Sequence, residues 1–595
     1  MFNDTLLRSV RDEIQEHLHF TEKETDIYKI FQSGDLANLD GLDDASLSRL
    51  PSVLKLRDAM YSARFREYLA AVTGSGKLSG RKTDMAINVY NEGCHLLCHD
   101  DVIGSRRLSY ILYLTDPDTP WQAEWGGALR LYPTSSEKDM HGEEVKIPSP
   151  DYSLSIPPSF NQLSFFTVQP GESFHDVEEV YHPEDKTAPK RVRMAISGWF
   201  HIPQEGEDGF EPGLEQKLAE RSSLAQLQGR GDIYDLPQAQ TVVYDQPDAE
   251  MEVEDKKGKG KAVEEEKKPK GAEFTESDLS FLVQYIAPSY LTPDIAEEMS
   301  ESFGNESTLS LERFLCEKFA TRVRAYIEEQ EKRGLPSSAE DIHKQTGWTV
   351  ARPPHKHRYV FLQPSAAAAA AAGESTTEKT PIDELLNDLF PSEAFRKWLA
   401  HVTGSDRLTS HNLLARRFRR GQDYTLASDY DGDEPRLEFT LGLTPTTGWE
   451  KDENENSNNS NGKPAGDAKE DEDLAVGGYE LYMAGDGDDD GDQAGAQNGD
   501  DPAIYRSAGA DEDDGILLTT AAGWNRLSIV YRDRGTLRFV KYVSAAARGD
   551  RWDITGEMGA EYDDDDDEDG EDDQDEGDQE VEDEEDGEEE EDDEE

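Results

Sequence analysis

The residues with the clearest capacity for chemistry are His99 and Asp101, at the end of the stretch NVYNEGCHLLCHDD (residues 88–101). Side chains two positions apart on a β-strand point to the same face, so these two are predicted to aim at one point. A second histidine would complete two imidazoles and one carboxylate, a ligand set that holds a non-haem Fe(II) and leaves other positions open. Most His-x-Asp triplets lie in surface loops, so the triplet predicts a metal site only together with support from the rest of the chain.

Five histidines are candidates for the remaining ligand, and His175 fits best. It lies in QPGESFHDVEEV (169–180), after a Pro-Gly turn and between two strand patterns, where a jelly roll would return the chain to the site. A lone histidine is more often a surface residue, so His175 gains its weight from the upstream triplet. The other candidates are His95, His141, His182 and His201.

A 2-oxoglutarate oxygenase also needs a cation for the distal carboxylate of its co-substrate, and the planar fork of arginine suits a carboxylate. Arg193 opens the strand pattern RMAISGWFH (193–201), and Arg191 is the alternative. Tyr90 and Tyr113 lie on strands flanking the triplet, where their hydroxyls could bond the same molecule. Each tyrosine is also typical of a core aromatic. No catalytic residue is predicted beyond the metal centre.

The elements that must position these residues change in type along the chain. Apolar periodicity predicts helices over residues 3–20 and 51–73, and the polar stretch 23–38 is interpreted as a loop. On the second helix, Phe65, Leu69 and Val72 are predicted to share one face. Short strand patterns follow at residues 86–90, 109–114, 126–132, 163–168 and 194–201. Short strands separated by Gly/Pro turns favour a sandwich or jelly roll over a parallel sheet.

Composition limits the class of protein. The 595 residues predict two to four domains. The net charge of −68 argues against direct binding to nucleic acid or to anionic membranes. Residues 563–595 hold 27 Asp or Glu and no Lys or Arg, which is typical of a disordered tail that solubilises the chain or attracts basic partners.

Three cysteines, Cys94, Cys98 and Cys316, are too few for a disulfide framework and suit a reducing compartment. Cys94 and Cys98 have no second pair to make a zinc site, so they are predicted to be core residues. The sequence shows no signal peptide and no long apolar run, which predicts a soluble intracellular protein.

The second half of the chain repeats the first. Five segments recur in the same order: residues 65–79 at 395–409, 108–115 at 437–444, 126–132 at 477–483, 161–166 at 525–530, and 193–198 at 551–556. Such agreement predicts two copies of one fold.

Laying one copy on the other predicts which copy holds a site. Without gaps, His99 falls opposite Ser428 and Asp101 opposite Tyr430, and a one-residue slip pairs them with Ala427 and Asp429. His175 falls opposite Phe539. Both histidine ligands are lost on either register, so the second copy is predicted to be degenerate and to serve structure or binding. It begins with a strand pattern at 353–364 that has no counterpart before Phe2, so the chain is expected to lack a first strand.

The two copies are joined by a charged segment. Residues 255–271 are rich in Lys and Glu and are predicted to form a linker, whose basic clusters can also be interpreted as a nuclear import signal. Helical patterns resume at 278–331, including 311–327. Strand patterns then run from 348 to about 559, interrupted by an alanine run at 366–372 and by acidic stretches at 451–473 and 485–514.

At this point the chain resembles a known family. The segments NVYNEGCHLLCHDDVIGSRRLSYILYLTD, WGGALRLY, FHDVEEVY and RMAISGWFH are similar to those of the fungal and animal prolyl 3,4-dihydroxylases of the 2-oxoglutarate/Fe(II) superfamily. These proteins are also described as translation-termination-associated and oxygen-sensing regulators. The resemblance covers roughly residues 3–205 and 273–560.

The resemblance implies a mainly β fold with flanking helices, built as two tandem double-stranded β-helix (jelly-roll) domains. It implies a catalytic domain at 1–240, a disordered linker at 241–272, a non-catalytic domain with acidic insertions at 273–560, and an acidic tail at 561–595.

The implied cofactors are Fe(II), 2-oxoglutarate, O₂ and L-ascorbate. The implied iron ligands are His99, Asp101 and His175, with Arg193, Tyr90 and Tyr113 contacting 2-oxoglutarate. The interval from His175 to Arg193 is longer than usual for the family, so Arg191 stays an alternative to Arg193 as the carboxylate anchor.

The implied substrate is a proline of a small-subunit ribosomal protein at the decoding centre, with translation-termination or transcription-regulatory proteins as further partners. The expected location is nucleus and cytoplasm. The competing hypothesis is an oxygen-sensing binding module that controls the stability of a transcription factor. An oxygenase acting on nucleic acid fits poorly with the net charge.

Overall fold

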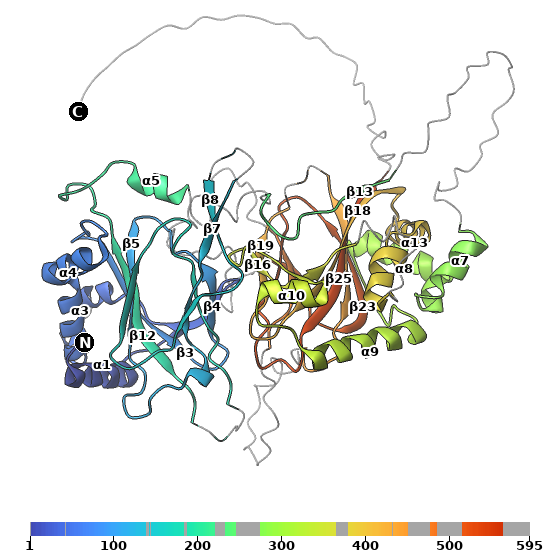
Figure 1. Cartoon of the computed structure of the whole chain (residues 1–595). Coiled ribbons are helices and arrows are strands. Elements are labelled where there is room, and N and C mark those ends of the chain that lie inside the picture. Colours follow the sequence, from blue (N-terminus) through green and yellow to red (C-terminus); the bar gives the residue numbers. More distant parts are fainter. Residues whose placement is uncertain are drawn as a thin grey trace, which may run out of the picture.

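The computed structural model describes residues 2–41, 43–138, 142, 144–183, 187, 189–220, 233–244, 274–364, 379–430, 432, 434–449, 476–484 and 515–562. Two β-rich halves lie side by side (Figure 1). The basic clusters, the alanine run, both acidic stretches and residues 563–595 lie outside the described residues, so the interpretations of these segments stay predictions.

The strands of the first half form one antiparallel sheet that folds into two layers, apart from a separate hairpin of β7 (Thr134–Lys138) and β8 (Glu144–Pro148). We call β10-β5-β12-β3 the major sheet and β4-β11-β6-β9 the minor sheet, and β2 pairs with both β3 and β4. This arrangement is a double-stranded β-helix, as predicted. The bounds are β2 Tyr28–Gln32, β3 Thr83–Tyr90, β4 His95–His99, β5 Arg106–Tyr113, β6 Leu129–Leu131, β9 Leu154–Ile156, β10 Leu163–Thr167, β11 His175–Val177 and β12 Arg193–His201.

Strand β2 corrects two predictions, that 23–38 is a loop and that the first copy lacks its first strand. Residues Thr21–Glu24 (β1) and Tyr28–Gln32 (β2) form a hairpin. In the second half the corresponding pairings are made by β16 (His357–Arg358) and β17 (Val360–Leu362). The polar composition concealed this strand because only Tyr28 and Ile30 of β2 are buried.

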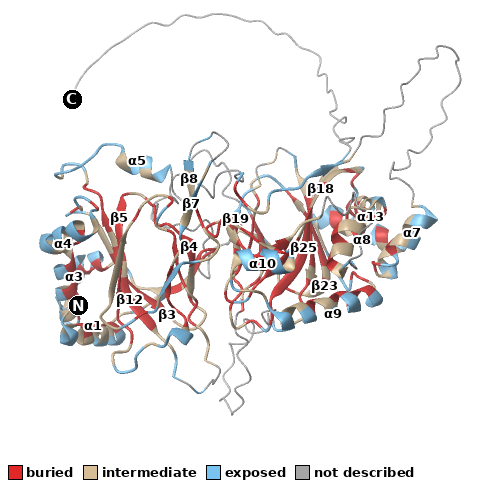
Figure 2. Cartoon of the chain, in the orientation of Figure 1, coloured by how far each residue is buried: buried red, intermediate tan, exposed pale blue. Residues whose placement is uncertain are grey.

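Helices cover the outer face of the first copy's major sheet. Helix α1 (Asp4–His17) begins at the N-cap Asn3, whose side chain accepts from the N–H of Leu6. The single helix predicted over 51–73 is wrong, because it is two helices, α3 (Pro51–Tyr61) and α4 (Ala63–Thr73), that meet at Ser62. The prediction of one apolar face also fails at Val72, which is 56% exposed. Figure 2 shows the buried residues gathered on the strands and on the inner sides of the helices.

The second half repeats this arrangement. Its major sheet contains β23-β20-β25-β18, and its minor sheet is β16-β19-β24-β21-β22. The bounds are β18 Arg407–Phe418, β19 Tyr424–Ser428, β20 Arg436–Leu443, β21 Glu480–Met483, β22 Ile516–Thr520, β23 Trp524–Arg532, β24 Leu537–Val540 and β25 Arg551–Glu561. Its covering helices include α7 Glu276–Leu282, α8 Pro293–Glu306, α9 Glu317–Arg333 and α13 Glu393–Thr403.

The helix predicted to include 311–327 is wrong at its start. Residues Thr308–Glu312 form strand β14, which pairs with β23 at the edge of the sheet. Leu311 is buried on this strand. The apolar residue on this short strand fits the periodicity of the helix that follows, so periodicity alone could not separate the strand from the helix.

Strand registers confirm the internal repeat. Arg193 pairs with Tyr90 in the first copy, and Arg551 pairs with Phe418 in the second. The side chain of Arg193 donates to the carbonyl of Gly127, and that of Arg551 donates to the carbonyl of the matching Gly478.

The segment 233–244 lies against the second copy. Leu236 forms a bridge with Arg352, and Val242–Val243 (β13) pairs with β18. The predicted boundary at residue 240 therefore differs from the packing, which assigns this segment to the second copy. Likewise Glu561, predicted to begin the tail, ends β25. No helix in the described ranges combines the length and apolarity needed to span a bilayer.

Candidate metal centre and co-substrate pocket

The three predicted ligands meet at the minor sheet of the first copy. His99 is the last residue of β4, His175 is the first residue of β11, and the two are paired across these antiparallel strands. Asp101 lies beyond the end of β4, with a left-handed φ of 61°. The predicted convergence is present, but strand alternation does not produce it. A backbone conformation that is uncommon for residues other than glycine turns the carboxylate back toward the two imidazoles.

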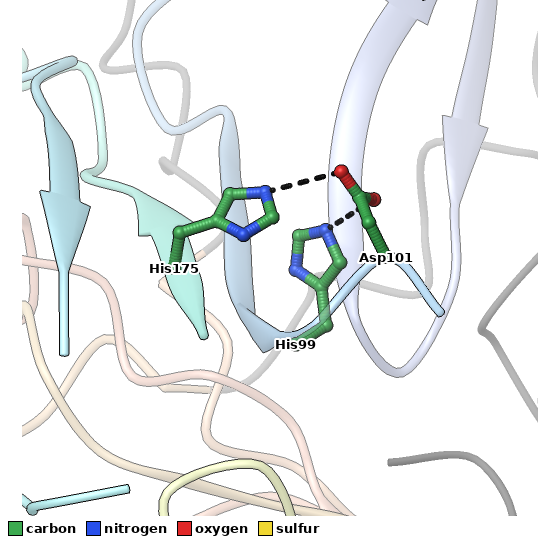
Figure 3. A group of neighbouring side chains, drawn as sticks. All are labelled: His99, Asp101 and His175. Atoms are coloured by element: carbon green, nitrogen blue, oxygen red, sulfur yellow. Dashed lines mark hydrogen bonds and ion pairs between the residues drawn. The ribbon is translucent and has the colours of Figure 1, made fainter. Parts of the chain in front are cut away.

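The three side chains point toward one another (Figure 3). Nε2 of His99 lies 3.1 Å from Oδ1 of Asp101, and Nε2 of His175 lies 3.5 Å from Oδ2. The ring centroids of the two histidines are 4.3 Å apart, and all three residues are at most 4% exposed. Among the described residues, these three form the group of His, Cys, Asp and Glu side chains close enough to hold one metal ion.

Backbone carbonyls orient both imidazoles. Nδ1 of His99 lies 2.8 Å from the carbonyl of Leu97, and Nδ1 of His175 lies 2.7 Å from the carbonyl of Ser173. A carbonyl accepts only, so each Nδ1 carries a proton, and Nε2 is the ring atom of each histidine that faces the centre. Such outer hydrogen bonds fix the tautomer of metal-binding histidines.

The two imidazoles differ in protonation. Burial disfavours the charged form of His99, but its hydrogen bond to Asp101 outweighs burial and raises the pKa of His99. Burial lowers the pKa of His175 to about 4, and the neighbouring His99 adds to this effect. Burial opposes ionisation of Asp101, but the two imidazoles outweigh it and hold the pKa of Asp101 well below its usual range. At neutral pH the centre therefore offers a carboxylate and a neutral His175, as a divalent cation requires.

The donor set fits Fe(II). Two imidazole nitrogens and one carboxylate suit this ion, and metal ligands at about 2.1 Å that subtend a right angle lie about 3 Å apart, close to the spacing observed. Two of the remaining candidate histidines are engaged elsewhere: His201 contacts Asp84 and Ser105, and the ring of His95 packs on Tyr542. His182 is half-buried outside the cluster, and His141 lies outside the described residues.

Asp100, which lies between two of the candidate ligands, supports the turn that follows β4. Asp100 is 1% exposed, and its carboxylate accepts from the N–H of Val102. Its own carbonyl accepts from the hydroxyl of Ser173 at 2.7 Å, which ties the turn after β4 to the segment before His175. Sequence reasoning missed Ser173, whose hydroxyl and carbonyl contact the segments on both sides of the centre.

Arg193 and the two tyrosines come together inside the same copy. The guanidinium of Arg193 lies 4.5 Å from the ring centroid of Tyr90 and 5.1 Å from that of Tyr113. Its Nε donates to the carbonyl of Gly127 at 2.7 Å. Burial raises the pKa of Tyr90 to about 12, while Arg193 opposes this and the charge of Asp101 adds to it. Tyr90 is therefore close enough to the cation and to the metal ligand to respond to both charges.

Two polar atoms of this cluster lack hydrogen bonds of ordinary geometry within the described part of the chain, although the hydroxyl of Tyr113 also interacts with Ser164 and Arg193. The two atoms are Nη2 of Arg193 and the hydroxyl of Tyr113, both buried. Unsatisfied buried donors are costly, and a carboxylate from a bound molecule would satisfy both. This observation fits the distal carboxylate of 2-oxoglutarate.

Arg191, the alternative anchor, is used differently. Its Nη1 donates to the carbonyl of Tyr181, and its guanidinium lies over the ring of Trp125. Sequence reasoning missed the role of Gly127. A Cβ at this glycine, whose φ is +71°, would lie 3.0 Å from Cδ of Arg193, so the Gly-Gly pair is the signal that could have indicated it.

The matching positions in the second copy carry different residues. Ser428 pairs with Arg538, and Thr425 pairs with Val540, which places Arg538 where the first copy has His175. The predicted match to Phe539 is therefore wrong by one residue, because the connection before β24 is one residue shorter. The loss of both histidine ligands is confirmed.

Ion pairs fill the interior of the second copy. Arg538 contacts Glu438 at 2.8 Å and Glu480 at 2.7 Å. Arg551, the counterpart of Arg193, contacts Asp553 at 3.0 Å. These side chains satisfy one another, so the cation matching Arg193 is already neutralised within the protein.

This network predicts an acid-sensitive second copy. Burial raises the pKa of Glu438, but Arg538, Arg532 and Arg436 outweigh it and lower the pKa to about 2, against an ordinary value of 4.5. The stabilisation is therefore complete above pH 4.5 and is lost as the pH falls toward 2. We expect the free energy of unfolding to be lower at pH 3 than at pH 6 by about 2 kcal/mol from this group.

Urea denaturation of the full chain and of Glu438→Gln across that pH range measures the effect. The variant has no carboxylate to protonate at this position, so its stability should depend less on pH. The same pH dependence in both chains would contradict the network's role.

Comparison with known protein families gives a match for each of the two copies. Residues 85–201 match the 2OG-Fe(II) oxygenase superfamily, a range that includes all six predicted site residues. Residues 277–566 match the family described as oxoglutarate and iron-dependent oxygenase degradation C-term.

Three relatives are similar over most of their length. The chain is 32% identical over 556 residues to prolyl 3,4-dihydroxylase OGFOD1 of Ostreococcus tauri, which covers 93% of this chain and 92% of the relative. It is 26% identical to prolyl 3-hydroxylase OGFOD1 of Mus musculus, covering 89% of this chain and 80% of the relative. It is 25% identical to prolyl 3-hydroxylase OGFOD1 of Xenopus laevis, covering 91% and 81%.

Proposed function

The chain belongs to the family of the OGFOD1 prolyl hydroxylases, within the 2-oxoglutarate/Fe(II) oxygenases, and we propose that it hydroxylates a prolyl residue of a protein substrate. The observation that carries the proposal is the buried His99–Asp101–His175 cluster in the same β-helix as an arginine with an unsatisfied guanidinium nitrogen. The division into a catalytic first copy and a non-catalytic second copy is part of this proposal.

His99, Asp101 and His175 would hold Fe(II) through two Nε2 atoms and a carboxylate oxygen. Fe(II) with 2-oxoglutarate and O₂ supplies the oxidising power to hydroxylate an unactivated C–H bond. The three residues would supply three ligands to the ion and leave its other positions for small molecules. Ascorbate is proposed as the reductant that keeps the iron in its ferrous state.

Arg193 would bind the distal carboxylate of 2-oxoglutarate, with Tyr113 donating a hydrogen bond. Charge-assisted bonds of this kind are strong, and the buried site strengthens them by excluding water. The carbonyl of Gly127 fixes Nε of Arg193 and leaves Nη2 to face the co-substrate. Tyr90, beside the same guanidinium, holds its orientation by cation–π contact.

For the substrate we propose a proline of a small-subunit ribosomal protein at the decoding centre, on the resemblance of the catalytic motifs. The strongly negative net charge supports a basic protein partner, because opposite charge accelerates encounter. A location in nucleus and cytoplasm accords with such a substrate.

Mass spectrometry of a decoding-centre peptide tests the proposal. The full chain is loaded anaerobically with Fe(II), 2-oxoglutarate and ascorbate, mixed with the peptide and exposed to air. We expect succinate and a peptide heavier by one or two oxygen atoms on proline, and no change in a peptide with alanine at that position. Succinate without peptide modification would overturn this substrate and keep the oxygenase. If the iron-loaded chain forms neither succinate nor modified peptide, the proposed enzymatic activity is wrong.

The second candidate is an oxygen-sensing module that controls the stability of a transcription-factor partner. The ion pairs that occupy the interior of the second copy favour it, since that copy is then left for binding. His99→Ala separates the two functions. If this variant loses turnover but still regulates the partner, the regulatory function does not need prolyl hydroxylation.

A further inference from the structure

The two copies pack through their minor sheets (Figure 1). Several contacts join them: the ring of His95 lies 4.2 Å from that of Tyr542, and Lys541 forms an ion pair with Glu24. The minor sheet of the first copy is also the sheet that carries His99 and His175. The second copy therefore lies directly behind the strands that bear the candidate ligands.

Two contacts from the second copy support the strands that bear the ligands, and we call them braces. The first brace acts on β4. Cys98 precedes His99, so on a strand its side chain points away from the metal centre, toward the second copy. The N–H of Cys98 lies 3.4 Å from the hydroxyl of Tyr424, which is the first residue of β19. That hydroxyl donates in turn to the carbonyl of Pro354 at 2.6 Å. Tyr424 thus joins the backbone beside His99 to the backbone beside His355.

The second brace acts on β11. Phe174 precedes His175 and is 1% exposed. The ring of His355 stacks on it, with centroids 4.8 Å apart and planes inclined by 23°. Both ring nitrogens of His355 lack hydrogen-bond partners within the described residues, and burial lowers its pKa well below the ordinary value. The neutral imidazole ring of His355 therefore packs face to face against the ring of Phe174.

The two braces form one continuous chain of contacts. It runs from His99 through Cys98, Tyr424 and Pro354 to His355, then through Phe174 to His175. A third contact anchors the end of the same segment. Glu179, four residues after His175, is fully buried and accepts from the N–H of Ala545 at 2.7 Å and from the hydroxyl of Ser544.

We propose that Tyr424 and His355 of the second copy are positioning residues for the metal centre of the first, setting the separation of the two histidine ligands. This inference rests on the proposed function, since it requires that His99 and His175 bind the metal. Protein interiors are closely packed and transmit strain, so a shift of either residue is expected to displace the neighbouring ligand. The degenerate copy is then a component of the active site's support, besides any partner that it binds.

Cobalt(II) binding to the metal-free full chain tests the proposal without turnover. Affinity is measured by competition with a chelator, and the visible d–d spectrum reports the ligand geometry. We expect His355→Ala and Tyr424→Phe to weaken Co(II) binding about tenfold and to alter the spectrum, as loss of outer-shell support does. His355→Phe keeps the flat ring and should restore both affinity and spectrum.

Lys541→Gln is the matched control. It removes an interface ion pair with Glu24, which lies on β1 and not on a ligand strand. It should weaken packing between the copies, seen as a lower Tm, with the Co(II) affinity unchanged. Equal Co(II) affinity and spectrum in the wild type, His355→Ala and Tyr424→Phe would overturn the positioning role. A wild-type chain that binds no Co(II) would overturn the metal centre itself, and with it this inference.

Discussion

Replacing His175 with alanine is expected to lower Fe(II)-dependent turnover of 2-oxoglutarate by more than about 100-fold. Loss of an outer hydrogen-bond partner of a metal ligand costs about 10- to 100-fold, and loss of the ligand itself exceeds that range. Only His99 and Asp101 would remain, from a single turn at the end of β4. Succinate formation and iron content of the purified chain measure the effect.

His182→Ala is the control for this variant. It removes a half-buried histidine from the same region, outside the cluster, so iron content and turnover should equal those of the wild type. Thermal denaturation of both variants separates loss of metal from loss of fold. Full iron content in His175→Ala would contradict the ligand assignment.

Replacing Arg193 with methionine is expected to raise the KM for 2-oxoglutarate about 100-fold. Truncating one partner of a buried charge pair costs about 2 to 5 kcal/mol, which corresponds to about 30-fold or more in affinity. Methionine fills much of the volume between Tyr90 and Tyr113, so the pocket should keep its shape. Steady-state kinetics with 2-oxoglutarate varied at saturating peptide measure the change.

Arg191→Met separates the two candidate anchors. Arg191 is engaged by Tyr181 and Trp125, so its loss should leave the KM for 2-oxoglutarate unchanged. Arg193→Lys is informative as well, since lysine keeps the charge but loses the fork and should fall between methionine and arginine. A raised KM in Arg191→Met with a normal KM in Arg193→Met would reverse the assignment.

Much of the fold could be predicted because its signals are local. Strand patterns and Gly/Pro turns predicted a sandwich or jelly roll, and five ordered matches predicted the repeat. Strand β2 escaped because it alternates over only five residues in a polar setting. The break at Ser62 was missed because helix-forming residues continue on both sides of it, and only the extended backbone at Ser62 separates the two helices.

The six candidate site residues could be named from the sequence, but the way in which they converge could not. Asp101 reaches the centre through a left-handed residue, which no side-chain pattern encodes. The contacts of Tyr424 and His355 with the ligand strands join residues more than 170 positions apart, across a surface shared by two copies. A count without gaps placed Phe539 opposite His175, where the structure has Arg538, because loop lengths differ between the copies.

The central claim is that this chain holds Fe(II) at His99, Asp101 and His175 and binds 2-oxoglutarate through Arg193. A crystal structure of the full chain with Mn(II) and 2-oxoglutarate, with data collected at the manganese absorption edge, tests it most directly. We expect one anomalous peak in contact with both Nε2 atoms and the Asp101 carboxylate, and the distal carboxylate of 2-oxoglutarate at Nη2 of Arg193. A peak at other residues, or 2-oxoglutarate bound away from Arg193, would contradict it.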